Sequence, residues 1–278
     1  LVDEVVENER PTGRGKADAF FYYRHQRGNP IINVWTASGK PTNTGRGRTK
    51  RALKREDLNP EQSVLAQRKD PDQYPEITYL GSRFEAIKLY REWNLGRYTA
   101  ARMPQKAELP EDYLEEDAGN LGLVLNDLEH RSGAWQKILE NMRSFHDRLE
   151  DITIRIHGGT VQIFLREKGL NQPVPATRLS DGTLRYLCLL TILLHPSPPP
   201  LICIEEPELG LHPDILPSIA GLLIDASLRT QLVVTTHSDV LVSALTETPE
   251  SVLVCEKDNE GSHYRRLDRE RLKEWIEK

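Results

Sequence analysis

The stretch LICIEEPELGLHPD, residues 201–214, carries the side chains best suited to chemistry. Its four apolar residues, 201–204, predict a buried strand that ends in two adjacent carboxylates, Glu205 and Glu206. Open α/β sheets bind ligands at the carboxyl ends of their strands. Successive strand residues point to opposite sides, so Glu205 can face a metal ion while Glu206 faces an attacking water. The alternative is a buried strand that exits into solvated acids.

A second motif is RLSDGTLR, residues 178–185. Ser180, Asp181 and Gly182 precede a predicted helix that is apolar almost all round and therefore buried. The free backbone N–H groups and the dipole of such a helix start favour an anion. The simpler interpretation is an ordinary N-cap made by Ser180 or Asp181.

Two histidines follow predicted elements in the same region. His237 comes directly after the strand-like run QLVVTT, and His212 comes after Gly210 and Leu211. Taken alone, each is typical of a polar residue at the exit of an element. His237 shares with the two glutamates a place at the carboxyl end of a predicted strand.

The elements around these residues predict an α/β fold. Residues 152–167 form two alternating runs about Gly158 and Gly159, which indicates a β-hairpin. After it, helical and strand-like runs alternate up to SVLVCEK, and this favours a parallel sheet covered on both faces. Upstream, Trp135, Ile138, Leu139, Met142, Phe145 and Leu149 are spaced as one helix face.

The N-terminal third is strand-rich and basic. The runs AFFYYRH and PIINVW flank a Gly-Asn-Pro turn signal, and a polar segment at 38–51 predicts a long exposed loop. Residues 10–55 hold twelve Lys or Arg against one acid, a local charge of +11 in a chain of net charge −5. We expect a polyanion contact from this segment. Its candidate residues are Arg46, Arg48, Lys50, Arg51, Lys54 and Arg55.

Composition limits the class of protein. The chain has 278 residues, of which 38% are hydrophobic and 28% charged, so it can bury a core. Its longest apolar run is shorter than a membrane span, and no secretory signal pattern starts the chain. Cys188, Cys203 and Cys255 form no CxxC pair, and we expect them to be reduced core residues. The sequence therefore predicts a cytoplasmic protein.

Together, the order and spacing of the motifs resemble the C-terminal half of ABC-type P-loop ATPases, in the RecF, SMC-like and OLD-related AAA-like group. Residues 179–183, LSDGT, resemble the signature motif, with Asp181 and Thr183 departing from its usual form. LICIEE resembles Walker B followed by the catalytic carboxylate. PELGLH resembles the D-loop, with His212 at its usual Asp position, and TTHSD supplies the switch histidine.

The resemblance implies an α/β P-loop NTPase fold, an ABC ATPase head with a largely parallel sheet, an antiparallel strand lobe and a helical insertion. It implies three parts: a lobe at 1–58, a helical lid or arm at 59–150 and the C-terminal ATPase lobe at 151–278. The cofactors are ATP and Mg²⁺. Glu205 would hold Mg²⁺, Glu206 would polarise the attacking water, and His237 would bind the γ-phosphate.

The partners follow from the same resemblance. Residues Ser180, Asp181, Gly182 and Thr183 would contact ATP held by another subunit, in a homodimer or larger homo-oligomer. DNA or an effector protein is the implied target, in repair or anti-phage defence, with no membrane involved.

The sequence has no Walker A loop, GxxxxGK[ST]. The chain starts at Leu1 rather than Met and ends in a helical pattern, so we expect it to be a piece of a longer protein whose P-loop lies upstream. Gln67 is the candidate for the Q-loop glutamine. Two other classes stay open: a metal-dependent nuclease using Glu205, Glu206 and Glu208, and a catalytically silent interaction module.

Overall fold

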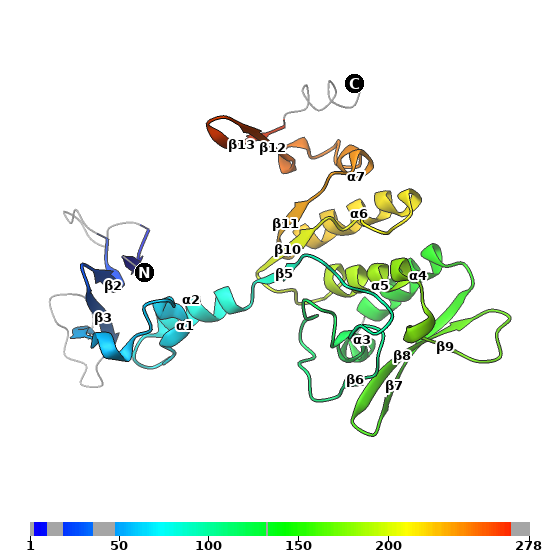
Figure 1. Ribbon diagram of the computed structural model, residues 1–278, viewed down its shortest axis with the longest axis horizontal. Coiled ribbons are helices and arrows are strands. Elements are labelled where there is room, and N and C mark those ends of the chain that lie inside the picture. The colour runs from blue at the N-terminus through cyan, green and yellow to red at the C-terminus, as the bar shows by residue number, and fades with distance from the viewer. Residues whose placement is uncertain (1–2, 10–18, 36–47, 132, 268–278) are drawn as a thin grey trace. The chain divides into compact units, whose positions relative to one another are not determined.

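The computed structural model describes residues 3–9, 19–35, 48–131 and 133–267. The chain divides into two compact units, Leu1–Ala86 and Ile87–Lys278 (Figure 1). The predicted division into 1–58, 59–150 and 151–278 differs from this one. The difference arises because the short helices after residue 59 pack with the N-terminal sheet, whereas the later helices belong to the core of the second unit.

The first unit is built on an antiparallel sheet in the order β1-β2-β3-β4. Its strands are β1 (Glu4–Glu7), β2 (Phe21–Gln26), β3 (Asn29–Trp35) and β4 (Arg48–Ala52). The predicted hairpin at the Gly-Asn-Pro signal is confirmed, and Arg27 and Gly28 make its turn at positive φ. The predicted loop at 38–51 is wrong at its end, because residues 48–52 form β4. Residues 36–47, including Arg46, lie outside the described residues.

One face of this sheet carries the core of the unit. Tyr23, Ile32 and Val34 are buried against residues of two helices, Val64 and Ile77. The helices are α1 (Val64–Gln67) and α2 (Pro75–Glu85), preceded by a 3₁₀ turn at Arg55–Asp57. The face that carries Tyr23 and Ile32 is therefore the one that packs against the helices.

The second unit contains the predicted parallel sheet. Its strands are β5 (Lys88–Tyr90), β10 (Leu201–Glu205) and β11 (Gln231–Thr235), in the order β11-β10-β5. Both neighbours of β10 run parallel to it, as the helix–strand alternation predicts. Helices α5 (Asp181–Leu193) and α6 (Leu216–Ser227) supply much of the surrounding core (Figure 1).

The prediction that both faces of this sheet are covered is wrong for the described residues. Ile202 and Ile204 are buried on one face, whereas Val233 on the other face is 49% exposed. Gln231 and Thr235 share that exposed face with Val233. Among the strands that the structure describes, β11 pairs with β10 alone. Among the described residues, the sheet therefore has one face that is not fully covered, and its edge at β11 is open.

The second unit also contains an antiparallel sheet, in which β8 (Thr160–Glu167) pairs with β6 (Gln105–Lys106), β7 (Leu149–His157) and β9 (Val174–Pro175). The predicted hairpin about Gly158 and Gly159 is confirmed as β7 and β8, and both glycines have positive φ. The predicted helix face is confirmed for Trp135, Ile138, Leu139 and Met142, which are buried on α4 (Ala134–Phe145), but it is wrong for Leu149, which begins β7. The other helix here is α3 (Leu121–His130).

The C-terminal part departs from the predicted alternation. SVLVCEK becomes β12 (Leu253–Asp258), which pairs with β13 (Gly261–Arg266) as an antiparallel hairpin rather than joining the parallel sheet. It follows α7 (Asp239–Ser243) and a 3₁₀ turn at Pro249–Ser251. Cys188 is buried as predicted, but Cys203 is only partly buried and Cys255 is exposed because β12 is not covered. Within the described ranges, no helix is long and apolar enough to cross a membrane.

Candidate functional site

Glu205 and Glu206 lie at the end of β10, beside the end of β11. Glu205 is opposite Thr235 in the parallel register, and the Glu206 amide donates to the Thr235 carbonyl oxygen at 2.9 Å. Glu206 has φ +45°, a left-handed conformation that is uncommon for a residue with a side chain. The chain therefore turns sharply at Glu206, and strained backbone of this kind gathers at functional sites.

His237 faces Glu206 from the neighbouring strand end. Its Nε2 lies 3.6 Å from Oε1 of Glu206. The His237 side chain is 93% exposed, whereas that of Glu206 is 30% exposed. The structure thus brings together a carboxylate and an imidazole that are 31 positions apart in the chain, at the edge where an open α/β sheet binds its ligand.

Glu208 connects the same two loops, and sequence reasoning gave it no part in the ATPase site. Its Oε1 accepts hydrogen bonds from the Thr236 hydroxyl and from the His237 amide, the latter at 3.1 Å. Its Oε2 is buried without a hydrogen-bond partner among the described residues. Its place two residues after Glu206, in a loop that leaves a buried strand, is the only sequence signal that marks it.

The start of α5 has the geometry of a capped helix end. Ser180 is the N-cap, and its Oγ accepts from the Thr183 amide at 3.0 Å. Thr183 is 9% exposed, and its hydroxyl is 2.7 Å from Ser180 Oγ, so its side chain faces inward. The exposed residues of the motif are therefore Ser180 and Asp181.

Arg102 binds the segment that leads into α5, a role that the sequence did not predict. It is a buried guanidinium that donates to the carbonyl oxygens of Leu95, Ala176 and Leu179 and pairs with Asp181. A buried arginine with so many acceptors fixes the backbone it contacts. No local sequence pattern marks it, because its acceptors are carbonyls 7 to 77 positions away.

The loop after β10 also reaches the start of α5. A Cβ atom at Gly182 would lie 3.1 Å from the Gly210 carbonyl oxygen, so the two backbones are in close approach. Gly210 itself has φ +71°. His212 does not join this contact: it caps the 3₁₀ turn Pro213–Ile215, its ring is 73% exposed, and its Nδ1 lies 3.3 Å from Asp214.

The structure weakens the nuclease interpretation. Within the described ranges, no group of three or more His, Cys, Asp or Glu side chains is arranged to hold a metal ion. Glu208 accepts hydrogen bonds from Thr236 and His237 and does not form a metal-binding group with Glu205 and Glu206. A single exposed carboxylate, Glu205, still fits Mg²⁺, which binds through one or two carboxylates together with substrate phosphates and water.

The basic candidates do not form one surface. Arg48 is 7% exposed, lies over the ring of Trp35 at 4.4 Å and pairs with Glu76. Lys50 and Arg51 are both exposed on β4, but neighbouring strand residues point to opposite faces. Lys54 is exposed, and Arg55 donates to the Gly28 carbonyl oxygen. Arg48 is therefore structural, and Lys50 and Arg51 lie on opposite faces of the sheet.

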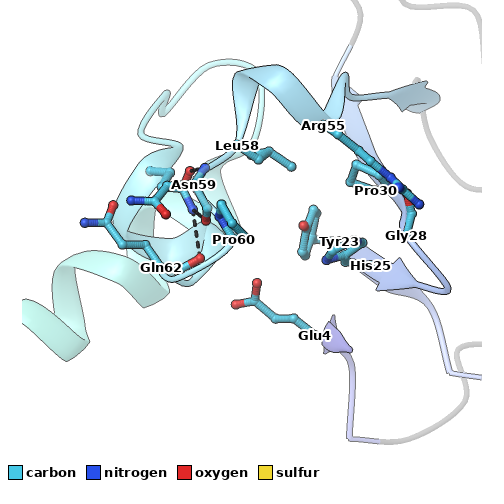
Figure 2. Close-up of a pocket in the computed structure, with 11 residues that line it drawn as sticks. Glu4, Tyr23, His25, Gly28, Pro30, Arg55, Leu58, Asn59, Pro60 and Gln62 are labelled. Carbon is cyan, nitrogen blue, oxygen red and sulfur yellow. Dashed lines mark hydrogen bonds between the residues drawn. The ribbon is translucent and has the colours of Figure 1, made fainter. Parts of the chain in front are cut away.

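Gln67 lines a pocket of about 340 Å³ in the first unit, with Tyr23, His25 and Arg55 among its other walls (Figure 2). Its amide is used within its own segment: Oε1 accepts from the Asn59 amide at 2.6 Å, and Nε2 donates to the carbonyl oxygen of Gln62 at 2.8 Å. The contacts of Gln67 are those of a residue that closes the turn before α1.

The sequence matches, over residues 49–243, the family described as "AAA domain, putative AbiEii toxin, Type IV TA system", and the chain belongs to that family. The α/β P-loop NTPase fold predicted from the motifs is thereby confirmed. The match includes the strand ends that carry Glu206 and His237 and the start of α5. A comparison with curated proteins finds no match.

Several solved structures are similar at low identity. One, from work on ATP-driven dimerization and DNA-stimulated activation of SMC ATPases, is 14% identical, with a TM-score of 0.42 over 56% of this chain and 95% of that one. An Smc head domain with a coiled coil from Pyrococcus yayanosii is 16% identical (TM-score 0.43; 56% and 30%). An Smc head bound to the C-winged helix domain of ScpA is 14% identical (TM-score 0.44; 94% and 79%). These similarities are too low to support a functional conclusion.

Proposed function

We propose that this chain carries the hydrolytic half of an ATPase site, at which Glu206 orients the attacking water and His237 contacts the γ-phosphate. The observation that supports the proposal best is the 3.6 Å approach of the two side chains at adjacent parallel strand ends. In phosphoryl transfer the protein mainly positions groups and stabilises charge. A partly buried carboxylate beside an exposed imidazole suits those two tasks.

Glu205 would hold Mg²⁺ at the same edge. Bound there, Mg²⁺ would neutralise charge on the phosphate oxygens. The two side chains differ in exposure: Glu205 is exposed, whereas Glu206 is partly buried. The neighbouring carboxylates would then divide metal binding from water orientation.

The phosphate-binding loop would come from a segment outside these 278 residues. The open edge of β11 and the partly uncovered face around Val233 support this proposal. Strands of parallel sheets are normally buried on both faces, so the exposed Val233 leaves room for a further layer on this face of the sheet. A strand and helix packed there would place their loop beside the Glu206–His237 pair.

Dimerisation and a macromolecular target complete the proposal. Ser180 and Asp181 are exposed at the start of α5, where the free amides of a helix start suit a phosphate from a second copy. The basic N-terminal segment would bind DNA or an acidic effector protein in the cytoplasm. The family description names a putative toxin of a toxin–antitoxin system, which fits a role in defence.

The test compares the full-length protein with this chain alone. With Mg²⁺ and ATP, the full-length protein should hydrolyse ATP, whereas this chain should bind ATP weakly and show no turnover, because it lacks part of the phosphate cradle. Turnover by this chain alone would show that an unrecognised phosphate loop lies within it. An inactive full-length protein would instead favour the silent interaction module.

A further inference from the structure

Glu208 connects the loop after β10 to the loop after β11 through a single carboxylate oxygen. Oε1 accepts from the Thr236 hydroxyl and from the His237 backbone amide. Two donors from consecutive residues converge on one acceptor, so the carboxylate fixes the direction in which the chain leaves β11. The contact acts on the backbone of His237 and leaves its ring free.

The ring of His237 has little else to hold it. Its side chain is 93% exposed, and among the described residues its one ion-pair contact is with Glu206, whose Oε1 lies 3.6 Å from its Nε2. Because an exposed side chain is not fixed by packing, the place of the imidazole depends on its backbone. The Glu206–His237 distance is therefore set largely by the hydrogen bonds on either side of His237.

These hydrogen bonds continue into the core of the unit. The Ser238 amide donates to the Thr236 hydroxyl at 3.0 Å, and Ser238 Oγ accepts from the Leu241 amide at 3.2 Å as the N-cap of α7. Leu241 is 2% exposed. Glu208 thus lies at one end of a chain of hydrogen bonds, and a buried residue anchors the other end.

The other side of Glu208 is fixed as well. Its carbonyl oxygen accepts from the Leu211 amide at 3.1 Å, and Pro207 before it is buried. The turn that contains Glu206 is therefore held at the same time as the loop of His237. A residue that spans both loops controls the spacing between them.

We propose that Glu208 is a positioning residue that holds the backbone of His237 so that its imidazole stays beside Glu206. The inference rests on the proposed function, since the spacing has value only if both side chains act on one phosphate. Misplacing a catalytic group by about 1 Å can cost on the order of 10²-fold in rate.

One arm of the test needs no ATP. Hydrogen exchange of the His237 amide, measured by mass spectrometry with residue-level fragmentation, should speed up by at least about tenfold in Glu208→Ala, because its acceptor is lost. The Leu241 amide should change much less, since its acceptor is Ser238. Glu247→Ala removes an exposed carboxylate of the same region and is the matched control. Unchanged exchange at His237 in Glu208→Ala would overturn the inference.

The second arm is the kinetics of the full-length protein. Glu208→Ala should lower kcat by roughly 10- to 100-fold with little change in KM, because orientation and not ATP binding is lost. Glu208→Gln should lose less than about threefold, since an amide oxygen can accept both hydrogen bonds. Its nitrogen would replace Oε2, which already lacks a partner among the described residues. Thr236→Val, which removes one of the two donors, should fall between them.

The outcomes separate the two claims. If Glu206→Gln abolishes turnover but Glu208→Ala does not lower kcat, the positioning role is wrong and the proposed function stands. If neither variant affects turnover, the proposed function fails, and hydrogen exchange at His237 still tests the contact with Glu208.

A global rise in hydrogen exchange in Glu208→Ala would indicate unfolding. The kinetics of Thr236→Val and Glu208→Gln would then test the positioning role. Equal loss in the Gln and Ala variants would also contradict the role.

Discussion

Arg102 and Asp181 form an ion pair that joins a buried side chain to the exposed first turn of α5. The two ends differ in exposure: the Arg102 side chain is 6% exposed and that of Asp181 is 73% exposed. Most of the hydrogen bonds of the guanidinium go to carbonyl oxygens of the segments around it. The arginine therefore organises the backbone that leads into the proposed signature motif.

Arg102→Ala should lower the free energy of unfolding by about 3 kcal/mol or more, because it leaves three buried carbonyl oxygens without their donor and each such group costs about 1–3 kcal/mol. Asp181→Ala should cost less than Arg102→Ala, because the guanidinium keeps its three carbonyl acceptors when the exposed carboxylate is removed. Arg178→Ala, an exposed arginine in the same segment, is the control and should stay within about 0.5 kcal/mol. Urea titration followed by tryptophan fluorescence measures all three. Equal losses for Arg102 and Arg178 would refute the assignment.

The two neighbouring basic residues of β4 should differ in DNA binding. Arg51 lies opposite Ile32, which belongs to the buried face, so Lys50 lies on the opposite, open face. The Lys50 ammonium and the Arg24 guanidinium both lie over the Phe21 ring, at 5.4 and 4.5 Å. Lys50→Ala should flatten the log–log salt dependence of duplex DNA affinity by about 0.9, the value for one phosphate contact. Arg51→Ala should change the slope less, and identical slopes for both variants and the parent would mean that β4 does not touch DNA.

His195 should make stability depend on pH. It is 4% exposed, its Nδ1 accepts from the Ser197 amide at 3.2 Å, and burial lowers its pKa below the ordinary value. The unfolded chain then binds a proton that the folded chain does not, so stability is present at neutral pH and is lost as pH falls below about 6.5. The slope from this one group is at most about 1.4 kcal/mol per pH unit. In His195→Gln that part of the slope should disappear from unfolding titrations between pH 7 and 5; an unchanged slope would count against it.

Local patterns predicted much of the fold because the interactions behind them are local. The Gly158–Gly159 hairpin, the buried face of α4 and the strand LICIE each depend on a period of apolar residues or on a turn glycine. The motifs also predicted that Glu206 and His237 each follow the carboxyl end of a strand, and the structure shows that these two strands are neighbours.

The sequence could not predict interactions between distant residues. Arg102 and Glu208 hold the candidate site by hydrogen bonds to carbonyls, amides and a hydroxyl, which are groups that any sequence offers. Arg48 reads as one more cation of a basic run, yet it is buried among rings because β4 pairs with β3. Val233 reads as a strand residue buried on both sides, but it is exposed on the partly uncovered face of the sheet. In each case the environment of the residue depends on which strand or loop packs next to it in the fold. A local sequence pattern carries no information about that neighbour.

Glu206→Gln in the full-length protein tests the central claim most directly. The amide can hydrogen-bond a water but cannot polarise it as the carboxylate does, so turnover should fall by on the order of 10²-fold or more. ATP binding should persist, and the ATP-bound dimer should accumulate in size-exclusion chromatography. The measurement is steady-state ATP hydrolysis beside ATP affinity, with Glu247→Ala as the control. A drop in turnover with intact binding is the predicted result, and parental turnover in Glu206→Gln would contradict the account.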